Sequence, residues 1–130
     1  MQVDVHMTMA STAGELLAFE ADAFLSRCMG NVALAERLLA KFQENSSRDL
    51  DSLEQAWGLR SGEQLRRLAH RLKGSSANMS ALQIRRRAAD IEALAVAERI
   101  DEIRQHLDQL HDDWGVFVES ARSHGFRAVS

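Results

Sequence analysis

The chain has 130 residues, with 16 basic and 19 acidic side chains and a net charge of −3. This length suffices for one domain with its own hydrophobic core, and the charge balance lacks the basic excess of nucleic-acid-binding proteins. Cys28 is the one cysteine in the sequence, which excludes a disulfide framework and a cysteine-rich zinc site. The absence of proline, the 5% aromatic content and the abundance of Ala, Leu, Glu, Gln and Arg predict an all-α fold.

The sequence shows no targeting or membrane-spanning pattern. No apolar run approaches the roughly 20 residues that cross a bilayer, and the first residues, MQVDVHMTMASTAG, lack a basic region followed by an apolar core. We therefore expect a protein of the reducing cytoplasm that does not insert into a membrane. Residues 1–12 are predicted to be a flexible segment, residues 13–124 a helical domain and residues 125–130 a frayed tail.

Apolar residues recur at spacings of three and four along most of the chain, which indicates successive amphipathic helices. A short first helix is predicted over residues 13–27. Asn31 is placed to cap a second helix that runs to about Trp57. Ser61 and Gln64 have the spacing of a capping box, which predicts the start of a third helix.

Ser80 and Gln83 repeat the capping-box spacing and predict the start of a fourth helix, and a fifth helix is predicted to begin near Arg99. The residues predicted to face the core along these last four helices are Ala35, Leu38, Leu39, Phe42, Ser46, Leu50, Leu53, Trp57, Leu65, Leu68, Ala69, Leu72, Ser76, Met79, Ile84, Ala88, Ile91, Leu94, Ala95, Ile100, Ile103, Leu107, Leu110, Trp114, Phe117 and Ala121. Because each helix has one apolar stripe and the connections are short, we expect an antiparallel four-helix bundle with an additional short N-terminal helix.

The stretch LAHRLKGSSANMSA, within the third predicted helix and its end, contains a glycine where a helix is least tolerant of one. Glycine inside a helix costs about 1 kcal/mol relative to alanine, so a role other than helix stability is expected. At about 100° per residue, His70 and Gly74 lie one turn apart on the outer side of the helix. Arg66, Lys73 and Ala77 fall on that side too.

An exposed imidazole with a cation and bare backbone beside it can act as a nucleophile toward another macromolecule. The missing side chain of Gly74 would let a partner's loop approach the helix closely. Lys73 would neutralise a phosphoryl group placed on the imidazole. Arg66, Arg67 and Arg71 raise the positive field around the same patch, which favours an acidic partner surface.

AHRLKGSSANMSA resembles the core motif of histidine-containing phosphotransfer (HPt) domains, His-x-(Leu/Phe)-Lys-Gly-(Ser/Ala)-(Ser/Ala). The resemblance extends from about Phe19 to Arg122, since GNVALAERLLAKF is similar to the family's second helix and GEQLRRLAHRLKGSS to its third. It implies a four-helix bundle that carries phosphate on His70 between receiver-domain aspartates of a multistep His–Asp relay. The partner would be the receiver domain of a hybrid sensor kinase, of a response regulator, or of both.

The resemblance also implies a phosphocarrier rather than an enzyme, because the family has no ATP site of its own. KGSS does not match a phosphate-binding loop, which needs Gly-x₄-Gly-Lys-Ser/Thr after a strand. The family therefore implies no cofactor of the chain's own. Mg²⁺ and most of the catalytic apparatus would belong to the partner receiver domain.

Two positions bear on how closely the chain follows the family. Ser80 stands ten residues after the histidine, where the family usually has a glycine that helps the turn. We expect Ser80, with Gln83, to cap the following helix instead. Glu92 stands 22 residues after the histidine, where some members have a Glu or Gln that hydrogen-bonds the ring. Glu92 therefore either accepts a hydrogen bond that orients the His70 ring or is a solvated surface residue, and the sequence leaves both interpretations open.

The other clusters of charged residues and histidines are expected to be ordinary surface residues. We expect a monomer that binds neither nucleic acid nor metal. Arg85, Arg86 and Arg87 are consecutive, so a helix spreads them over much of its circumference. His106 and His111 are five residues apart and do not share a helix face, which argues against a metal pair.

Alternatives to the phosphocarrier function stay open. The main one is a helical-bundle adaptor that binds a receiver or kinase domain without carrying phosphate. The combination of His70, Lys73 and Gly74 favours the carrier, because binding alone needs no nucleophile. A further alternative is direct phosphorylation by an ATP-dependent kinase domain. The sequence fits both a free-standing protein and the C-terminal domain of a hybrid kinase.

Overall fold

The structure, a computed structural model, describes residues 17–126 and contains helices and no strand within that range. The helices are α2 (Ala21–Arg27), α3 (Val32–Gly58), α4 (Gly62–Asn78), α5 (Leu82–Val96) and α6 (Ile100–Ser123). The all-α prediction is confirmed for these residues. The predicted flexible segment 1–12 lies outside the described residues, as do positions 13–16 of the predicted first helix and positions 127–130 of the predicted tail.

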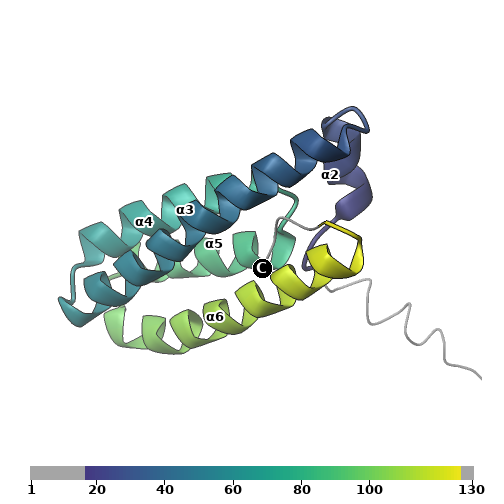
Figure 1. Ribbon diagram of the computed structural model, residues 1–130. Helices are drawn as coiled ribbons and strands as arrows, with labels where there is room; N and C mark the ends of the chain where they lie inside the picture. Colours follow the sequence, from purple (N-terminus) through teal and green to yellow (C-terminus); the bar gives the residue numbers. More distant parts are fainter. Residues whose placement is uncertain (1–16, 127–130) are drawn as a thin grey trace, which may run out of the picture.

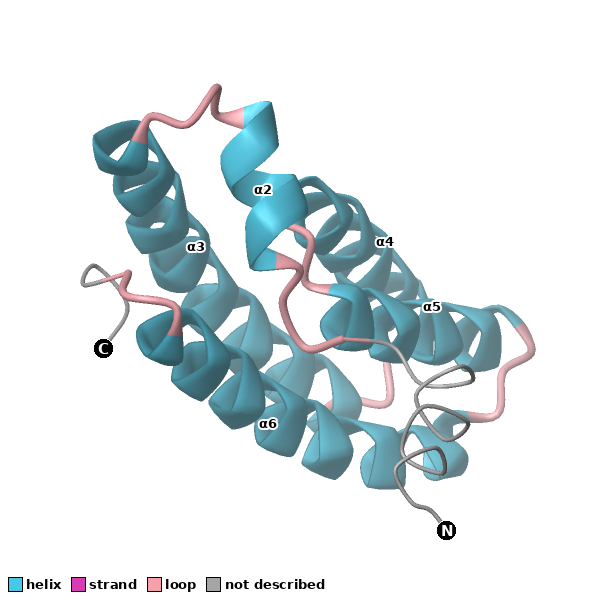
Figure 2. Ribbon diagram, turned by 90° about the vertical axis from the view of Figure 1, so that its right-hand side faces the viewer, coloured by secondary structure: helices cyan, strands magenta, loops and turns pink. Residues whose placement is uncertain are grey.

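The four long helices lie side by side as a helical bundle (Figures 1 and 2). Going around the bundle, α4 packs between α3 and α5, and α6 packs between α5 and α3. α2 is short and lies at one end, beside α3 and α4 (Figure 2). None of the helices in residues 17–126 is long and apolar enough to cross a membrane.

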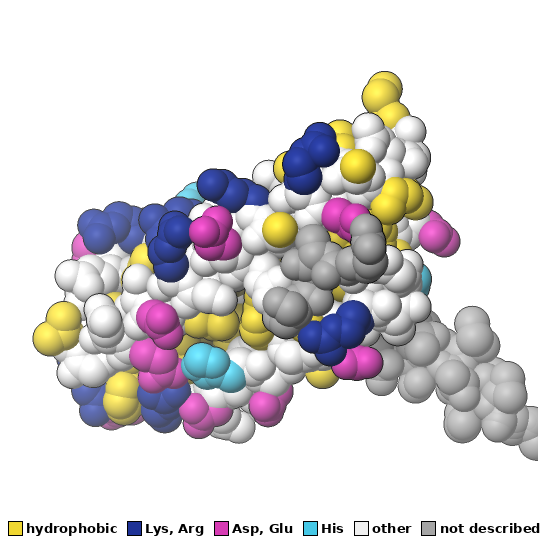
Figure 3. All heavy atoms as spheres, viewed as in Figure 1, with side chains coloured by type: hydrophobic (Ala, Val, Ile, Leu, Met, Phe, Trp, Pro, Cys, Tyr) yellow, Lys and Arg dark blue, Asp and Glu magenta, His cyan; other side chains and the backbone are white. Residues whose placement is uncertain are grey.

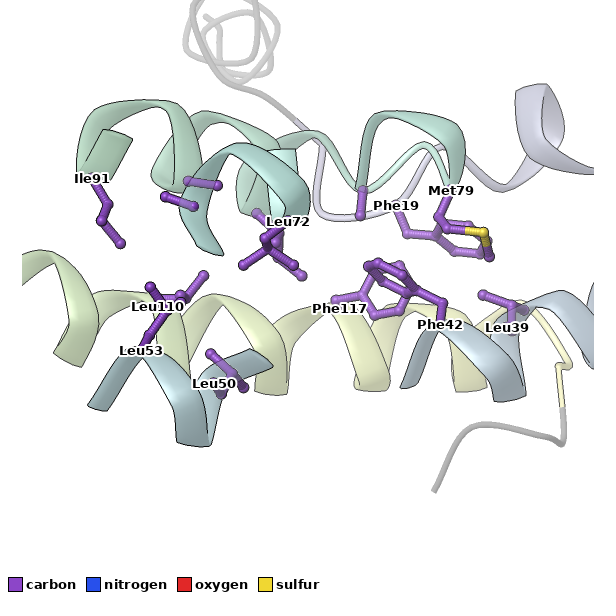
Figure 4. Packing of buried hydrophobic residues seen from close by; sticks show 14 of the residues in the cluster. Phe19, Leu39, Phe42, Leu50, Leu53, Leu72, Met79, Ile91, Leu110 and Phe117 are labelled. Atoms are coloured by element: carbon purple, nitrogen blue, oxygen red, sulfur yellow. The ribbon is translucent and has the colours of Figure 1, made fainter. Parts of the chain in front are cut away.

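One continuous core runs along the inside of the bundle, and Figure 4 shows α3 residues such as Leu50 and Leu53 facing side chains of the other helices. At the end near α2 the core is aromatic. The ring of Phe117 lies 5.2 Å from that of Phe19 and 5.5 Å from that of Phe42, between ring centroids. Most predicted core residues are buried; those left exposed or only partly buried are Leu38, Trp57, Leu68, Leu94, Ile100 and Trp114.

The first helix begins later than the sequence predicts. Residues 17–20 are not helical, and α2 starts at Ala21. The backbone N–H of Glu20 donates to the carbonyl of Ser80 (3.0 Å), and Phe19 is buried in the aromatic part of the core. These long-range contacts outweigh local helix propensity, a common result of tertiary packing. Phe126, placed by the sequence in the frayed tail, is buried against the same rings.

Two of the three predicted helix caps are confirmed. The Asn31 side chain accepts a hydrogen bond from the backbone N–H of Leu34 at the start of α3 (3.0 Å). The Ser61 hydroxyl accepts one from the backbone N–H of Gln64 at the start of α4 (3.2 Å). Each cap satisfies a backbone donor that has no partner within its helix.

The prediction that Ser80 caps the next helix is wrong. The N-cap of α5 is Ala81, which makes no side-chain cap. Ser80 instead ends α4 in a left-handed conformation (φ +57°), with its N–H donating to the Ala77 carbonyl and the next N–H donating to the Ser76 carbonyl. This is the Schellman arrangement, whose left-handed residue is most often glycine. The Ser80 hydroxyl accepts a hydrogen bond from Arg27 (2.6 Å) and makes no cap to α5.

Candidate functional site

His70 lies on the outer side of α4, as the helical wheel predicts. Its side chain is 64% exposed, although Ala69 and Leu72 beside it in sequence are buried in the core. The backbone around it is fixed by this packing. The imidazole is therefore held on a rigid element and open to a partner.

Glu92 approaches His70 and Lys73 from α5 and contacts both. Its Oε2 lies 2.8 Å from Nδ1 of His70, and its Oε1 lies 2.7 Å from Nζ of Lys73. The Glu92 side chain is only 18% exposed, and that of Lys73 is 35% exposed. The structure thus brings together the three residues that the sequence nominates for the chemistry.

The electrostatics of this cluster keep Glu92 ionised. The hydrogen bond from Lys73 is the largest cause that lowers the pKa of the Glu92 carboxyl, and the contact with His70 lowers it further, against the opposing effect of burial. An ionised carboxylate can only accept hydrogen bonds. In a neutral ring, Nδ1 of His70 therefore carries the proton and Nε2 carries the free lone pair.

Gly74 and Ala77 place no large side chain on the α4 surface next to His70. Both residues are exposed. A Cβ atom built on Gly74 would meet nothing within 4 Å, so packing inside the protein does not require glycine there. Nothing within the described residues therefore accounts for the glycine.

The three arginines predicted to attract an acidic partner all lie on α4, but two are already paired. Arg66 is bonded to Glu63, one turn before it (2.9 Å), and Arg71 is bonded to Asp49 of α3 (2.5 Å). The hydrogen bond from Arg66 also lowers the pKa of the exposed Glu63. Arg67 is exposed. Lys and Arg side chains gather over α3 and α4 in the upper left of Figure 3.

A groove beside this surface, between α2, α3 and α4, was not foreseen from the sequence. It encloses about 410 Å³. Its lining is Phe24, Arg27, Cys28, Leu38, Lys41, Phe42, Asn45, Ser75, Asn78 and Met79. The one sequence signal for it is Leu38, which fits the apolar stripe of α3 yet is 41% exposed because it lines the groove rather than the core.

The two histidines of α6, His106 and His111, contact different residues and do not form a pair. Nδ1 of His106 lies 3.5 Å from the Arg87 guanidinium, and Nε2 of His111 lies 3.0 Å from Glu54. Within residues 17–126, no group of three or more His, Cys, Asp or Glu side chains is arranged to hold a metal ion.

Comparison with known families matches residues 37–115 to the Hpt domain. Comparisons with curated proteins and with solved structures give no significant match. The matched region is more than half of the chain and contains His70, Lys73, Gly74 and Glu92. The chain therefore belongs to the Hpt domain family, whose members take part in histidine phosphotransfer in two-component relays.

Proposed function

We propose that this protein is a phosphocarrier of a multistep His–Asp relay, which takes a phosphoryl group from the aspartate of one receiver domain onto His70 and passes it to another. The observation that carries the proposal is the exposed imidazole of His70 with its Nδ1 held by Glu92 (2.8 Å). This contact leaves Nε2 as the nucleophilic nitrogen. The ring needs no further base, because no proton has to leave Nε2.

In the transfer step, the Nε2 lone pair attacks the phosphorus of the receiver's aspartyl phosphate. The N–P bond forms as the P–O bond to the aspartate breaks, and that electron pair leaves with the carboxylate. The ring gains positive charge, which the Glu92 carboxylate stabilises through the proton on Nδ1. Lys73, held beside His70 by the same carboxylate, offsets the negative charge of the phosphoryl group. Reversal of these steps gives the phosphoryl group to the next aspartate.

The chain supplies only the nucleophile and its immediate surroundings. Mg²⁺ would be bound by the receiver domain, and no ATP site is needed because the phosphoryl donor is already activated. We place the reaction in the cytoplasm and assign it to a monomeric antiparallel four-helix bundle, whose short N-terminal helix forms one wall of the groove.

The receiver domain would dock over α4 and the adjoining groove. Gly74 and Ala77 permit close approach beside His70, and Arg67 contributes positive charge on the same helix. The groove adds apolar surface from the exposed Leu38, beside the basic side chains of Arg27 and Lys41. A receiver surface fits this description, since its phospho-acceptor aspartate and metal-binding carboxylates are acidic.

The test uses receiver domains encoded in the same genome, purified and charged with ³²P-acetyl phosphate and Mg²⁺. Mixing each with the protein should move label to the protein, and that label should be acid-labile and alkali-stable, as expected for phosphohistidine. Mass spectrometry should place it on His70, and His70→Gln should take none. Binding of a receiver with no transfer of label would favour the adaptor alternative and overturn the carrier.

A further inference from the structure

Arg27, the last residue of α2, is anchored to the end of α4. Its Nη2 donates to the backbone carbonyl of Asn78 (2.7 Å) and to the hydroxyl of Ser80 (2.6 Å). The last carbonyls of a helix lack partners within the helix and carry partial negative charge. The guanidinium is therefore held at one place by two acceptors.

Ser80 is an unexpected residue at this position. Its φ of +57° lies in the left-handed region, which glycine adopts with the least strain. Ser80 is buried, with only 2% of its surface exposed. Its hydroxyl therefore does not face an outside partner, and it accepts a hydrogen bond from Arg27 within the protein. The Ser80 carbonyl also accepts from the N–H of Glu20 just before α2 (3.0 Å), so both ends of α2 are attached to this one residue.

The anchored guanidinium lies at the groove that adjoins the His70 surface. Arg27 and Asn78 both line this groove, together with apolar residues such as Phe24 and Met79. Asn78 follows His70 by two turns of α4, a rise of about 12 Å. A domain that reacts at His70 and extends along α4 by this distance reaches Asn78, whose carbonyl holds Arg27.

We propose that the Ser80–Arg27 contact determines which receiver domains this protein accepts. Ser80 is a positioning residue that holds the Arg27 guanidinium ready for a carboxylate on the docking receiver, beside apolar side chains that enter the groove. This inference rests on the proposed function. A guanidinium held in place loses less freedom on binding than a mobile one. A receiver that lacks the carboxylate would cover this positive charge without supplying an anion, which penalises that receiver.

The experiment measures phosphotransfer from a panel of ³²P-charged receiver domains to the parent protein and its variants. Arg27→Ala should lower kcat/KM by about tenfold to a hundredfold for the preferred receivers, the loss expected for one charge-assisted hydrogen bond, and should change it little for the others. Ser80→Gly relieves the backbone strain, so it should unfold at or above the parent temperature while showing part of the same loss of preference. The double variant should be no worse than Arg27→Ala, because Ser80 acts through Arg27.

Arg99→Ala is the matched control, since Arg99 is an exposed arginine at the α5–α6 turn, paired with Glu102. It should keep the parental rates for every receiver. Parental receiver preference in either Arg27→Ala or Ser80→Gly would overturn this inference, while label on His70 of the parent would leave the proposed function intact. Absence of label on the parent from every receiver would overturn the proposed function itself.

Discussion

Nζ of Lys73 lies 2.7 Å from Oε1 of Glu92, so the lysine of the proposed site is already paired before any phosphoryl group arrives. A phosphoryl group on His70 would compete with Glu92 for this ammonium. Because a phosphoryl group carries more negative charge than a carboxylate, it would draw Lys73 toward itself. Glu92 would then retain its contact with Nδ1 of His70, so the cluster would suit both the free and the phosphorylated state of the proposed carrier.

Replacement of Lys73 by alanine should slow phosphotransfer and shorten the lifetime of the phosphohistidine, because the charge that offsets the phosphoryl group is removed. The expected loss in rate is about tenfold to a hundredfold, the range for one charge-assisted hydrogen bond. The measurements are the rate of ³²P transfer from a charged receiver to the protein and the decay of label on the isolated phosphoprotein. Lys73→Arg is the matched control and should recover part of the lifetime. A parental lifetime in Lys73→Ala would remove the lysine from the site.

Gly74 should matter to the partner and not to folding. Because a Cβ there meets nothing within 4 Å, Gly74→Ala should stabilise the protein by up to about 1 kcal/mol in urea unfolding. Gly74→Gln should fold equally well but slow transfer from the receiver, because its side chain would stand where the receiver approaches α4. Ala77→Gln serves as a second probe of the same surface. Transfer by Gly74→Gln at the parental rate would contradict close approach of the receiver at this point.

The free energy of unfolding should decrease as the pH is lowered through the acidic range, in part because of Glu54, which connects α3 to α6 through its contacts with Arg104 and His111. Hydrogen bonds from Arg104 and His111 lower the pKa of this carboxyl below its ordinary value of 4.5. The unfolded chain therefore binds the proton more readily, and the stability that Glu54 contributes is present above pH 4.5 and lost as the pH falls through the lowered pKa. Glu54→Gln should lose less stability than the parent between pH 5 and pH 3 in urea unfolding. Equal losses would show that other groups dominate acid unfolding.

Several helices end at a non-glycine residue with a left-handed backbone conformation. Replacing such a residue by glycine should change the stability of the protein and not its function. Glu98, between α5 and α6, has φ +59° and is exposed, and its N–H donates to the Ala95 carbonyl in the turn (3.1 Å). Because glycine adopts this conformation without the strain of a Cβ, Glu98→Gly should raise stability by up to about 1 kcal/mol. Glu98→Ala, which keeps the Cβ, is the control. A glycine variant no more stable than the alanine variant would refute the strain argument.

The sequence correctly predicts features that depend on a single helix, such as which side of it a residue occupies and where it begins. The wheel of α4 correctly places His70 on the outside, and Asn31 is correctly identified as the N-cap of α3. It fails where distant segments meet. The role of Ser80 follows from a side chain 53 residues away. The contact of Glu92 with His70 is one of two interpretations that the sequence leaves open, because it depends on how α5 packs against α4, which the periodicity of neither helix determines. The groove was missed for the same reason.

The last prediction concerns which nitrogen of His70 carries the proton. In water the neutral ring of histidine favours the proton on Nε2, which would leave the outward nitrogen without its lone pair. The Glu92 carboxylate, 2.8 Å from Nδ1 and kept ionised by Lys73, favours the opposite tautomer. At a pH where the ring is neutral, ¹⁵N NMR of the parent should show Nδ1 protonated and Nε2 unprotonated.

Glu92→Ala should shift this balance toward the Nε2-protonated ring and slow phosphorylation of His70 without abolishing it, because the reactive tautomer becomes a minority form. Glu92→Gln, whose amide oxygen can still accept from Nδ1, should keep the parental tautomer yet lose the negative charge that stabilises the phosphorylated ring. The two variants thereby separate orientation of the ring from stabilisation of its charge. A parental ¹⁵N pattern in Glu92→Ala would mean that Glu92 does not set the tautomer, and its contact with His70 would then have only a structural role.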